Sequence, residues 1–189
     1  MPMRRSALVF VFIVLAAAVS GSAQVSESAT GRQLTITGGG FGSAFNPNDG
    51  NHALYGAGTN HLVGLGTFVD VHFTHWIQIQ GEARWLRFDQ YAGEHMDNYF
   101  IGPKVPIHQF GRTNVYGKVM IGMGKMTFPH NFGYGTFTAL AYGGGLDYKL
   151  SPKLTVRAVD FEFQQWPLFL NNTALYPYGV SVGLGYKVF

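Results

Sequence analysis

Residues 77–85 read IQIQGEARW, and this stretch alternates strictly between two kinds of side chain. Ile77, Ile79 and Trp85 share one parity with a glycine and an alanine, whereas the glutamines, the glutamate and the arginine take the other. Successive side chains of a β-strand point to opposite faces, so the stretch predicts a strand with one apolar and one charged face. The charged face meets bulk water in a soluble sheet, or the lumen in a small membrane barrel.

The composition is unusual for a soluble domain. Charged residues make up 12% of the 189 residues, whereas about 25% is usual in soluble domains. Glycine contributes 26 residues, roughly twice its ordinary share of about 7%. The length fits one domain. The chain contains no cysteine, which excludes disulfides and a cysteine-linked lipid anchor.

The N-terminus predicts a secretory signal peptide over residues 1–23. Arg4 and Arg5 precede an apolar run over 7–19, and small residues follow up to Ala23. This order is typical of a signal peptide, and the run is shorter than the ~20 residues of a spanning helix, which is the alternative. Without the two arginines, 11 Lys and Arg remain against 10 Asp and Glu. No basic cluster survives, so we expect no nucleic-acid partner.

Eight alternating runs follow a polar segment at 24–32, and no later segment is long and apolar enough for a transmembrane helix. We expect strands at 33–45, 61–73, 76–88, 98–108, 114–126, 136–150, 154–166 and 176–189. The connections between them alternate between long and short, which places all the long ones at one end of an up-and-down barrel. The fold prediction is therefore all-β: an eight-stranded antiparallel up-and-down transmembrane β-barrel over residues 33–189.

Three features favour lipid outside the barrel over a soluble lipocalin-like barrel, in which the faces are reversed. The chain carries an export signal, its loops are asymmetric, and aromatic residues mark strand ends as interfacial girdles do. These aromatic residues are Phe73, Trp76, Tyr99, Tyr148, Trp166, Tyr176 and Tyr178.

In such a barrel the charges must point inward, because each Lys or Arg on the lipid face at midplane costs about 2–4 kcal/mol. The lumen-facing charges predicted from parity are Glu82, Arg84, Lys104, Lys118, Asp160 and Glu162. We interpret them as a buried ion-pair network, with a gated path for small ions and a catalytic role as the alternatives. Arg87 and Arg157 fall on the apolar parity, which requires either snorkelling at a strand end or a bulge near Ala158.

The mature chain resembles the OmpA-like family of eight-stranded outer-membrane β-barrel domains, in a branch similar to barrels of Acidobacteria-type bacteria. The resemblance is carried by GEARWLRF at 81–88, DNYFIGPKV at 97–105, GGGLDYKLSPKLTVRAVDFEFQQWP at 143–167 and YGVSVGLGYKVF at 178–189. It implies an integral protein of the bacterial outer membrane, in contact with lipid and lipopolysaccharide and inserted by the barrel-assembly machinery. It also implies an assembly signal at Tyr186 and Phe189, although Phe189 falls off the lipid-facing parity.

No motif for metal binding, cofactor binding or catalysis stands out. His72 and His75 flank a turn without a completing carboxylate, and NPNDGN at 46–51 lacks the closing Glu of a calcium loop. Ser43, Ser151 and Ser181 lack the histidine and acid that a barrel lipid hydrolase needs. We therefore expect neither metal nor cofactor, and no enzyme.

The loops FPHNFGYG at 128–135 and PLFLNNTALYP at 167–177 are unusually aromatic. We expect them to fold over the barrel mouth or to lie in the membrane interface, with a contact surface for a partner or for lipopolysaccharide as the alternative. The predicted function is structural or interactive: membrane integrity, adhesion or surface contact through four long external loops. The alternative is a narrow porin-like channel, followed by a lipid-modifying enzyme or a soluble lipocalin-like binder.

Overall fold

The computed structural model describes residues 34–48, 61–73, 76–88, 93–131, 133–169 and 173–188, within a compact unit of residues 33–189. The predicted signal peptide at 1–23 and the polar segment at 24–32 lie outside the described residues, as do His75 and Phe189. The strands are β1 (Thr35–Asn46), β2 (Leu62–His72), β3 (Gln78–Phe88), β4 (His95–Phe110), β5 (Thr113–Thr127), β6 (Tyr134–Lys149), β7 (Leu154–Gln165) and β8 (Tyr178–Lys187). A short 3-10 helix, η2 (Pro129–Asn131), lies between β5 and β6. Within the described segments, no helix is long and apolar enough to cross a membrane.

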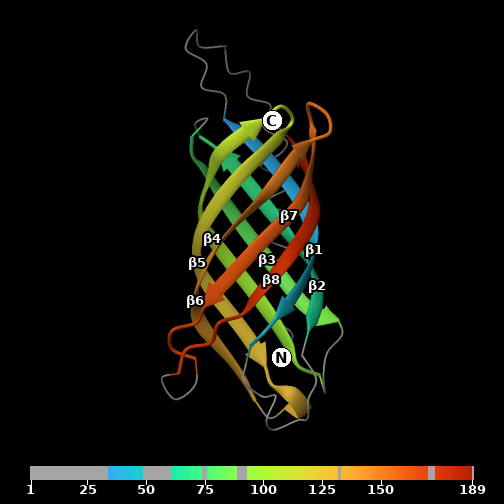
Figure 1. Ribbon diagram of the computed structural model, residues 1–189. Coiled ribbons are helices and arrows are strands. Elements are labelled where there is room, and N and C mark those ends of the chain that lie inside the picture. The colour runs from blue at the N-terminus through green and yellow to red at the C-terminus, as the bar shows by residue number, and fades with distance from the viewer. Residues whose placement is uncertain are drawn as a thin grey trace, which may run out of the picture. The chain divides into compact units, whose positions relative to one another are not determined.

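The eight strands form one closed antiparallel barrel in which each strand pairs with the next along the chain (Figure 1). The barrel closes between its first and last strands, where Thr37 lies opposite Lys187 and Asn46 lies opposite Tyr178. Closure leaves no free sheet edge, as a sheet surrounded by lipid requires. The predicted fold is confirmed, and each predicted strand is present with its ends shifted by a few residues.

The connections between strands separate by length to the two ends of the barrel. Residues 73–77, 111–112 and 150–153 form the short connections at what we call the turn end, which carries the C label in Figure 1. Residues 47–61, 89–94, 128–133 and 166–177 connect the strands at the opposite end, the loop end. Residues suited to tight turns form the short connections. Gly111 has a φ of 56°, which glycine adopts without steric cost. The hydroxyl of Ser151 accepts hydrogen bonds from the amides of Lys153 and Leu154.

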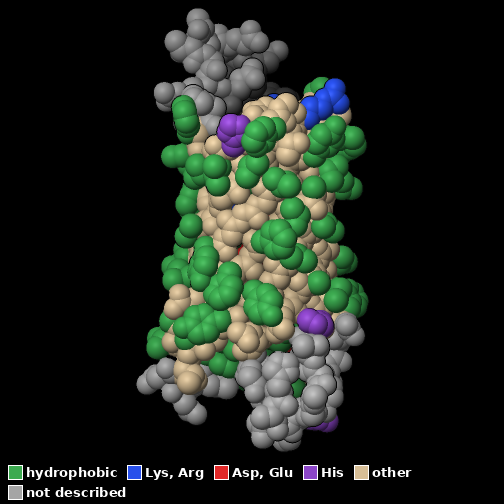
Figure 2. All heavy atoms as spheres, in the orientation of Figure 1, with side chains coloured by type: hydrophobic (Ala, Val, Ile, Leu, Met, Phe, Trp, Pro, Cys, Tyr) green, Lys and Arg blue, Asp and Glu red, His purple; other side chains and the backbone are tan. Residues whose placement is uncertain are grey.

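Side chains alternate along the strands between an apolar outer wall and an interior that holds the buried charged residues together with an apolar cluster. Val119 and Ile121 on β5 and Val182 and Leu184 on β8 expose more than half of their surface on the outside. The face of the wall in Figure 2 carries hydrophobic side chains and main chain, and the blue Lys and Arg side chains in view lie near the turn end. On the inner face, Lys118 on β5 and Glu82 and Arg84 on β3 are buried in the lumen. The charged face of IQIQGEARW is therefore the inner one, as a membrane barrel requires.

A β-bulge in β7 turns Arg157 into the lumen. Arg157 and Asp160 are both 1% exposed although three positions separate them, and the pairing of β7 shifts register here against both β6 and β8. In a regular strand, inward side chains are an even number of positions apart. The extra residue of a bulge makes an odd spacing possible. Arg87 instead stays outside at the loop end of β3, where its side chain is 52% exposed and forms an ion pair with Asp97.

The aromatic prediction holds on the outer wall with one exception. Phe73, Trp76 and Tyr178 are exposed there, and so are Tyr99, Tyr148 and Tyr176. Trp166 was predicted for the outer girdle, and this was wrong, because its side chain is fully buried in the core. Trp166 lies just after the end of β7 at the same parity as the inward Glu162 and Gln164. The alternation of β7 continues to this residue, so its side chain also points inward.

Candidate functional site: the filled lumen

The lumen has three zones between the turn end and the loop end. A polar vestibule lies at the turn end, a network of ion pairs fills the middle, and an apolar cluster closes the loop end. Inward side chains of the eight strands line all three zones, and residues of the loop-end connections complete the third.

Two cations and three carboxylates form the part of the network nearer the loop end. Arg84 on β3 donates to both oxygens of Glu162 on β7, at 2.7 and 3.2 Å. Lys118 on β5 binds Glu82, Asp160 and Glu162 through its Nζ, at 3.1, 2.8 and 2.9 Å. Each of these side chains is at most 6% exposed. Charges buried to this extent persist only when they are paired, and here every cation has at least two carboxylate partners.

A second part of the network lies nearer the turn end. Lys104 on β4 bridges Asp70 on β2 and Asp147 on β6, at 3.0 and 2.6 Å. Arg157 links the two parts, because its guanidinium reaches Glu82 at 3.2 Å as well as Asp147 at 3.5 Å. The described lumen thus joins five carboxylates and four cations in one connected network.

Aromatic faces complete the surroundings of the cations. The guanidinium carbon of Arg157 lies 3.9 Å from the ring centroid of Phe68, and that of Arg84 lies 4.3 Å from that of Phe45. The Lys104 Nζ is 4.0 Å from the Tyr116 ring centroid. Such contacts are worth about 0.5–2 kcal/mol each, and they fill the directions in which a cation has no carboxylate partner.

The six charged residues predicted for the lumen, Glu82, Arg84, Lys104, Lys118, Asp160 and Glu162, all lie in this network. The structure adds Asp70, Asp147 and Arg157. Asp70 and Asp147 stand on the inward parity of their strands, so alternation alone could have found them. Arg157 required the bulge, which the sequence leaves open as one of two alternatives. Of the proposed assembly residues, Tyr186 is half exposed on the outer wall.

An apolar cluster occupies the lumen at the loop end. Its centre is the buried Trp166, whose Nε1 donates to Gln164 at 2.9 Å, and whose ring stacks on Phe137. Phe128 and Phe169 from two loop-end connections pack against it, with Phe169 4.8 Å from Phe137 between ring centroids. Further members are Phe45, Leu62, Leu86, Met96, Phe100, Met120, Met126, Ala139, Ala141 and Leu175. Phe128 and Phe169 thus fold over the barrel mouth, as we expected of these two loops, whereas Tyr134 and Tyr176 of the same loops are exposed.

The vestibule at the turn end has a volume of about 490 Å³. Its lining includes Asp70, Lys104, Asp147 and Arg157, which belong to the part of the network nearer the turn end. Lys149 and Lys187 also line it, so its formal charge is positive with histidine neutral. The vestibule is a polar cavity that ends on ion pairs.

The serine and histidine candidates do not form a catalytic arrangement in the described residues. The hydroxyls of Ser43 and Ser181 hydrogen-bond each other at 2.7 Å inside the barrel. Ser43 lies opposite Gly64 on β2, eight residues from His72, which is roughly 26 Å along a strand. Among the described residues, no three His, Asp or Glu side chains are arranged so that they could hold a metal ion.

Comparison with known proteins identifies this architecture. The model of the outer membrane protein beta-barrel domain family matches residues 11–187. No curated protein matches the chain. The N-terminal β-barrel domain of Pseudomonas aeruginosa OprF is similar with a TM-score of 0.59 at 12% identity, covering 82% of this chain and 99% of that one.

Two further solved structures show the same fold. Neisserial surface protein A has a TM-score of 0.57 at 8% identity, over 82% of this chain and 96% of its own. OprG from Pseudomonas aeruginosa has a TM-score of 0.51 at 12% identity, over 82% and 95%. These likenesses establish the fold, and the family match adds the membrane setting. The chain belongs to the outer membrane protein beta-barrel domain family and is a transmembrane β-barrel of that family.

Proposed function

We propose that the protein is a structural and surface-contact barrel of the outer membrane, exported through a cleaved signal peptide, whose lumen does not conduct. The observation that carries this proposal is that two separate zones fill the lumen. Ion pairs join opposite walls in the middle, and the apolar cluster around Trp166 closes the loop end. An ion would have to cross both zones, and the second is filled mainly by apolar side chains, with Gln164 hydrogen-bonded to Trp166 among them.

The proposed role places contact with the surroundings on the outside of the barrel. The apolar wall contacts lipid, and the loop end faces lipopolysaccharide and any partner outside the cell. At this end Arg87 and Asp97 hold β3 and β4 together with an ion pair of 2.6 Å. Tyr134 and Leu168 are 77% and 67% exposed. The rigid barrel would hold such side chains in place for contact, as scaffolds with functional loops do.

The experiment that tests this proposal is single-channel recording of the refolded protein in a planar bilayer. A mobility shift between boiled and unboiled samples on a gel would establish that the protein is folded. We expect a folded barrel without steady conductance. Steady conductance of the wild type that changes in Arg84→Ala or Glu82→Ala would overturn the proposal, because both side chains belong to the filled lumen.

The second candidate function is a narrow channel for ions or very small solutes. The vestibule favours it, because this polar cavity already leads from the turn end to Lys104 and Asp147. Opening would require the ion pairs to rearrange and Trp166 to leave the axis. Trp166→Ala therefore discriminates between the candidates: a channel blocked by the apolar cluster should gain conductance, whereas a barrel also blocked by its ion pairs should stay silent.

A further inference from the structure

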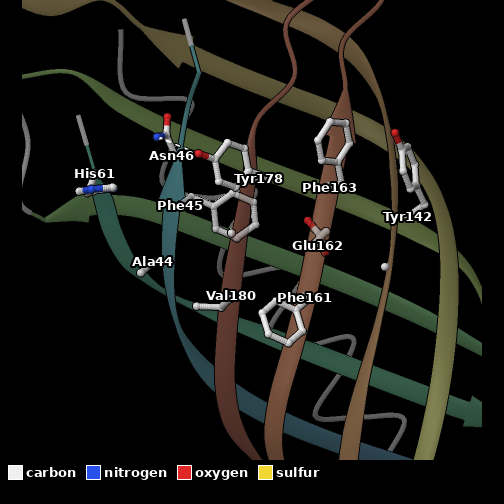
Figure 3. Close-up of a pocket in the computed structure, with 12 residues that line it drawn as sticks. Ala44, Phe45, Asn46, His61, Tyr142, Phe161, Glu162, Phe163, Tyr178 and Val180 are labelled. Carbon is white, nitrogen blue, oxygen red and sulfur yellow. Dashed lines mark hydrogen bonds between the residues drawn. The ribbon is translucent and has the colours of Figure 1, made fainter. Parts of the chain in front are cut away.

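A hollow of about 850 Å³ lies in the lipid-facing wall near the loop end. Figure 3 shows its sides, where the rings of Phe161, Phe163 and Tyr178 stand on the neighbouring strands β7 and β8. Ala44 on β1 also lines it and lies directly opposite Val180 on β8, so a small outward residue stands beside the larger ones. The volume is within the range of about 300–1,000 Å³ that is typical of small-molecule sites.

The lining of the hollow changes character toward the loop end. Apolar and aromatic side chains surround its deeper part, where Phe161 and Val180 are outward and exposed. Asn46 and His61 lie at its rim, and the Asn46 amide donates to the Tyr178 hydroxyl at 3.3 Å. Aromatic residues with polar tips gather where hydrocarbon meets headgroups in membrane barrels. The hollow thus runs from headgroup depth into the hydrocarbon layer.

We propose that this hollow binds one molecule of lipid A, the acylated phosphosugar lipid of the outer leaflet, with an acyl chain between Ala44, Phe161 and Val180. The phosphosugar headgroup lies at Asn46 and His61, whose side chains can hydrogen-bond sugar hydroxyls and phosphate. The hollow is continuous with the wall that lipid already covers, so a lipid reaches it without leaving the membrane. Its apolar depth suits a hydrocarbon chain, and its polar rim suits a headgroup.

The test is native mass spectrometry of the refolded full-length barrel with hexa-acylated lipid A, and with phosphatidylglycerol as the comparison lipid. Ala44→Phe fills the hollow, and Val182→Phe is the matched control, because it adds a comparable ring to the same lipid-facing wall, on β8. If the added ring displaces about two methylene groups of the chain, lipid A affinity should fall about tenfold in Ala44→Phe. Val182→Phe should bind as the wild type does. A gel mobility shift establishes that both variants fold.

We expect saturable binding of one lipid A to the wild type, weaker binding of phosphatidylglycerol, and a further loss of lipid A in His61→Ala. Equal binding of lipid A by Ala44→Phe and Val182→Phe would overturn the site, and so would equal binding of the two lipids. A dimer of the wild-type barrel that only Ala44→Phe disrupts would overturn it as well, because a second copy would then occupy the hollow. The site rests on the proposed contact of the loop end with lipopolysaccharide, and these outcomes do not depend on whether the lumen conducts.

Discussion

Arg84 on β3 and Glu162 on β7 join opposite walls of the barrel through two hydrogen bonds of 2.7 and 3.2 Å. The two strands stand four positions apart in a ring of eight, so this bidentate pair crosses the lumen. Planar, bidentate Arg–carboxylate pairs are among the strongest and most directional in proteins. The pair therefore contributes both to the closure of the lumen and to the stability of the barrel.

We predict that Arg84→Met destabilises the barrel far more than Arg87→Met does. Loss of Arg84 leaves Glu162 and Glu82 buried with one cation fewer, and breaking a buried pair costs about 3–5 kcal/mol. Arg87 lies on the same strand and its side chain is 52% exposed, while that of its partner Asp97 is 6% exposed. Water reaches one side of this pair, so we expect a loss nearer the roughly 0–1 kcal/mol of exposed pairs than the cost of breaking a wholly buried one. The measurement is the free energy of unfolding by urea in lipid vesicles. Similar losses in the two variants would contradict the buried network.

The bulge in β7 leads to a second prediction, on deletion of Ala158. Ala158 lies within the three-residue step from Arg157 to Asp160, which β8 matches with only the two positions from Gly183 to Ser181. Deleting Ala158 makes the strand regular while Arg157 and Asp160 both stay on the inner face. We expect the variant to fold and to lose about 1 kcal/mol of unfolding free energy, a typical value for a single change.

The matched control is deletion of Val119 from β5, which pairs with β6 in unbroken register at this point. This deletion reverses the facing of the residues before it, and turns Lys118 toward lipid. Gel mobility shifts after refolding compare the two variants. Folding of the Val119 deletion together with misfolding of the Ala158 deletion would show that the bulge is placed wrongly.

Fluorescence of single-tryptophan variants tests the inward position of Trp166. The chain has three tryptophans; Trp76 is 67% exposed on the outside, Trp85 is partly exposed there, and Trp166 is fully buried. We expect brominated lipid to quench a variant that retains only Trp85, since bromine on the acyl chains reaches the outer wall. A variant that retains only Trp166 should resist both brominated lipid and aqueous acrylamide. Strong lipid quenching of Trp166 would restore its place in the outer girdle.

Much of this barrel could be predicted from local pattern. Alternation in stretches such as 77–85 determines strand, face and parity together, because a strand has a repeat of two. Asp70 and Asp147 show that parity predicts even network members that we did not select from the sequence. Trp166 shows the opposite error, because an aromatic residue near a strand end was assigned to the girdle against its own parity.

Pattern alone could not determine the partners within the lumen. Arg84 and Glu162 are 78 positions apart, and their contact depends on the barrel having eight strands and on the stagger of each pairing. Arg157 depends on a single extra residue that two neighbouring strands must accommodate together. The same holds for the hollow beside Ala44, whose sides come from strands that meet only when the barrel closes.

The sequence by itself determined that the strands form a transmembrane barrel and which face of each strand is charged, because these properties follow from periodicity, composition and connection length. The tertiary structure decided which charges pair, which residues close the loop end, and where the outer wall is hollow. Those properties depend on which strands become neighbours or face each other across the lumen, and this is decided only when β1 pairs with β8.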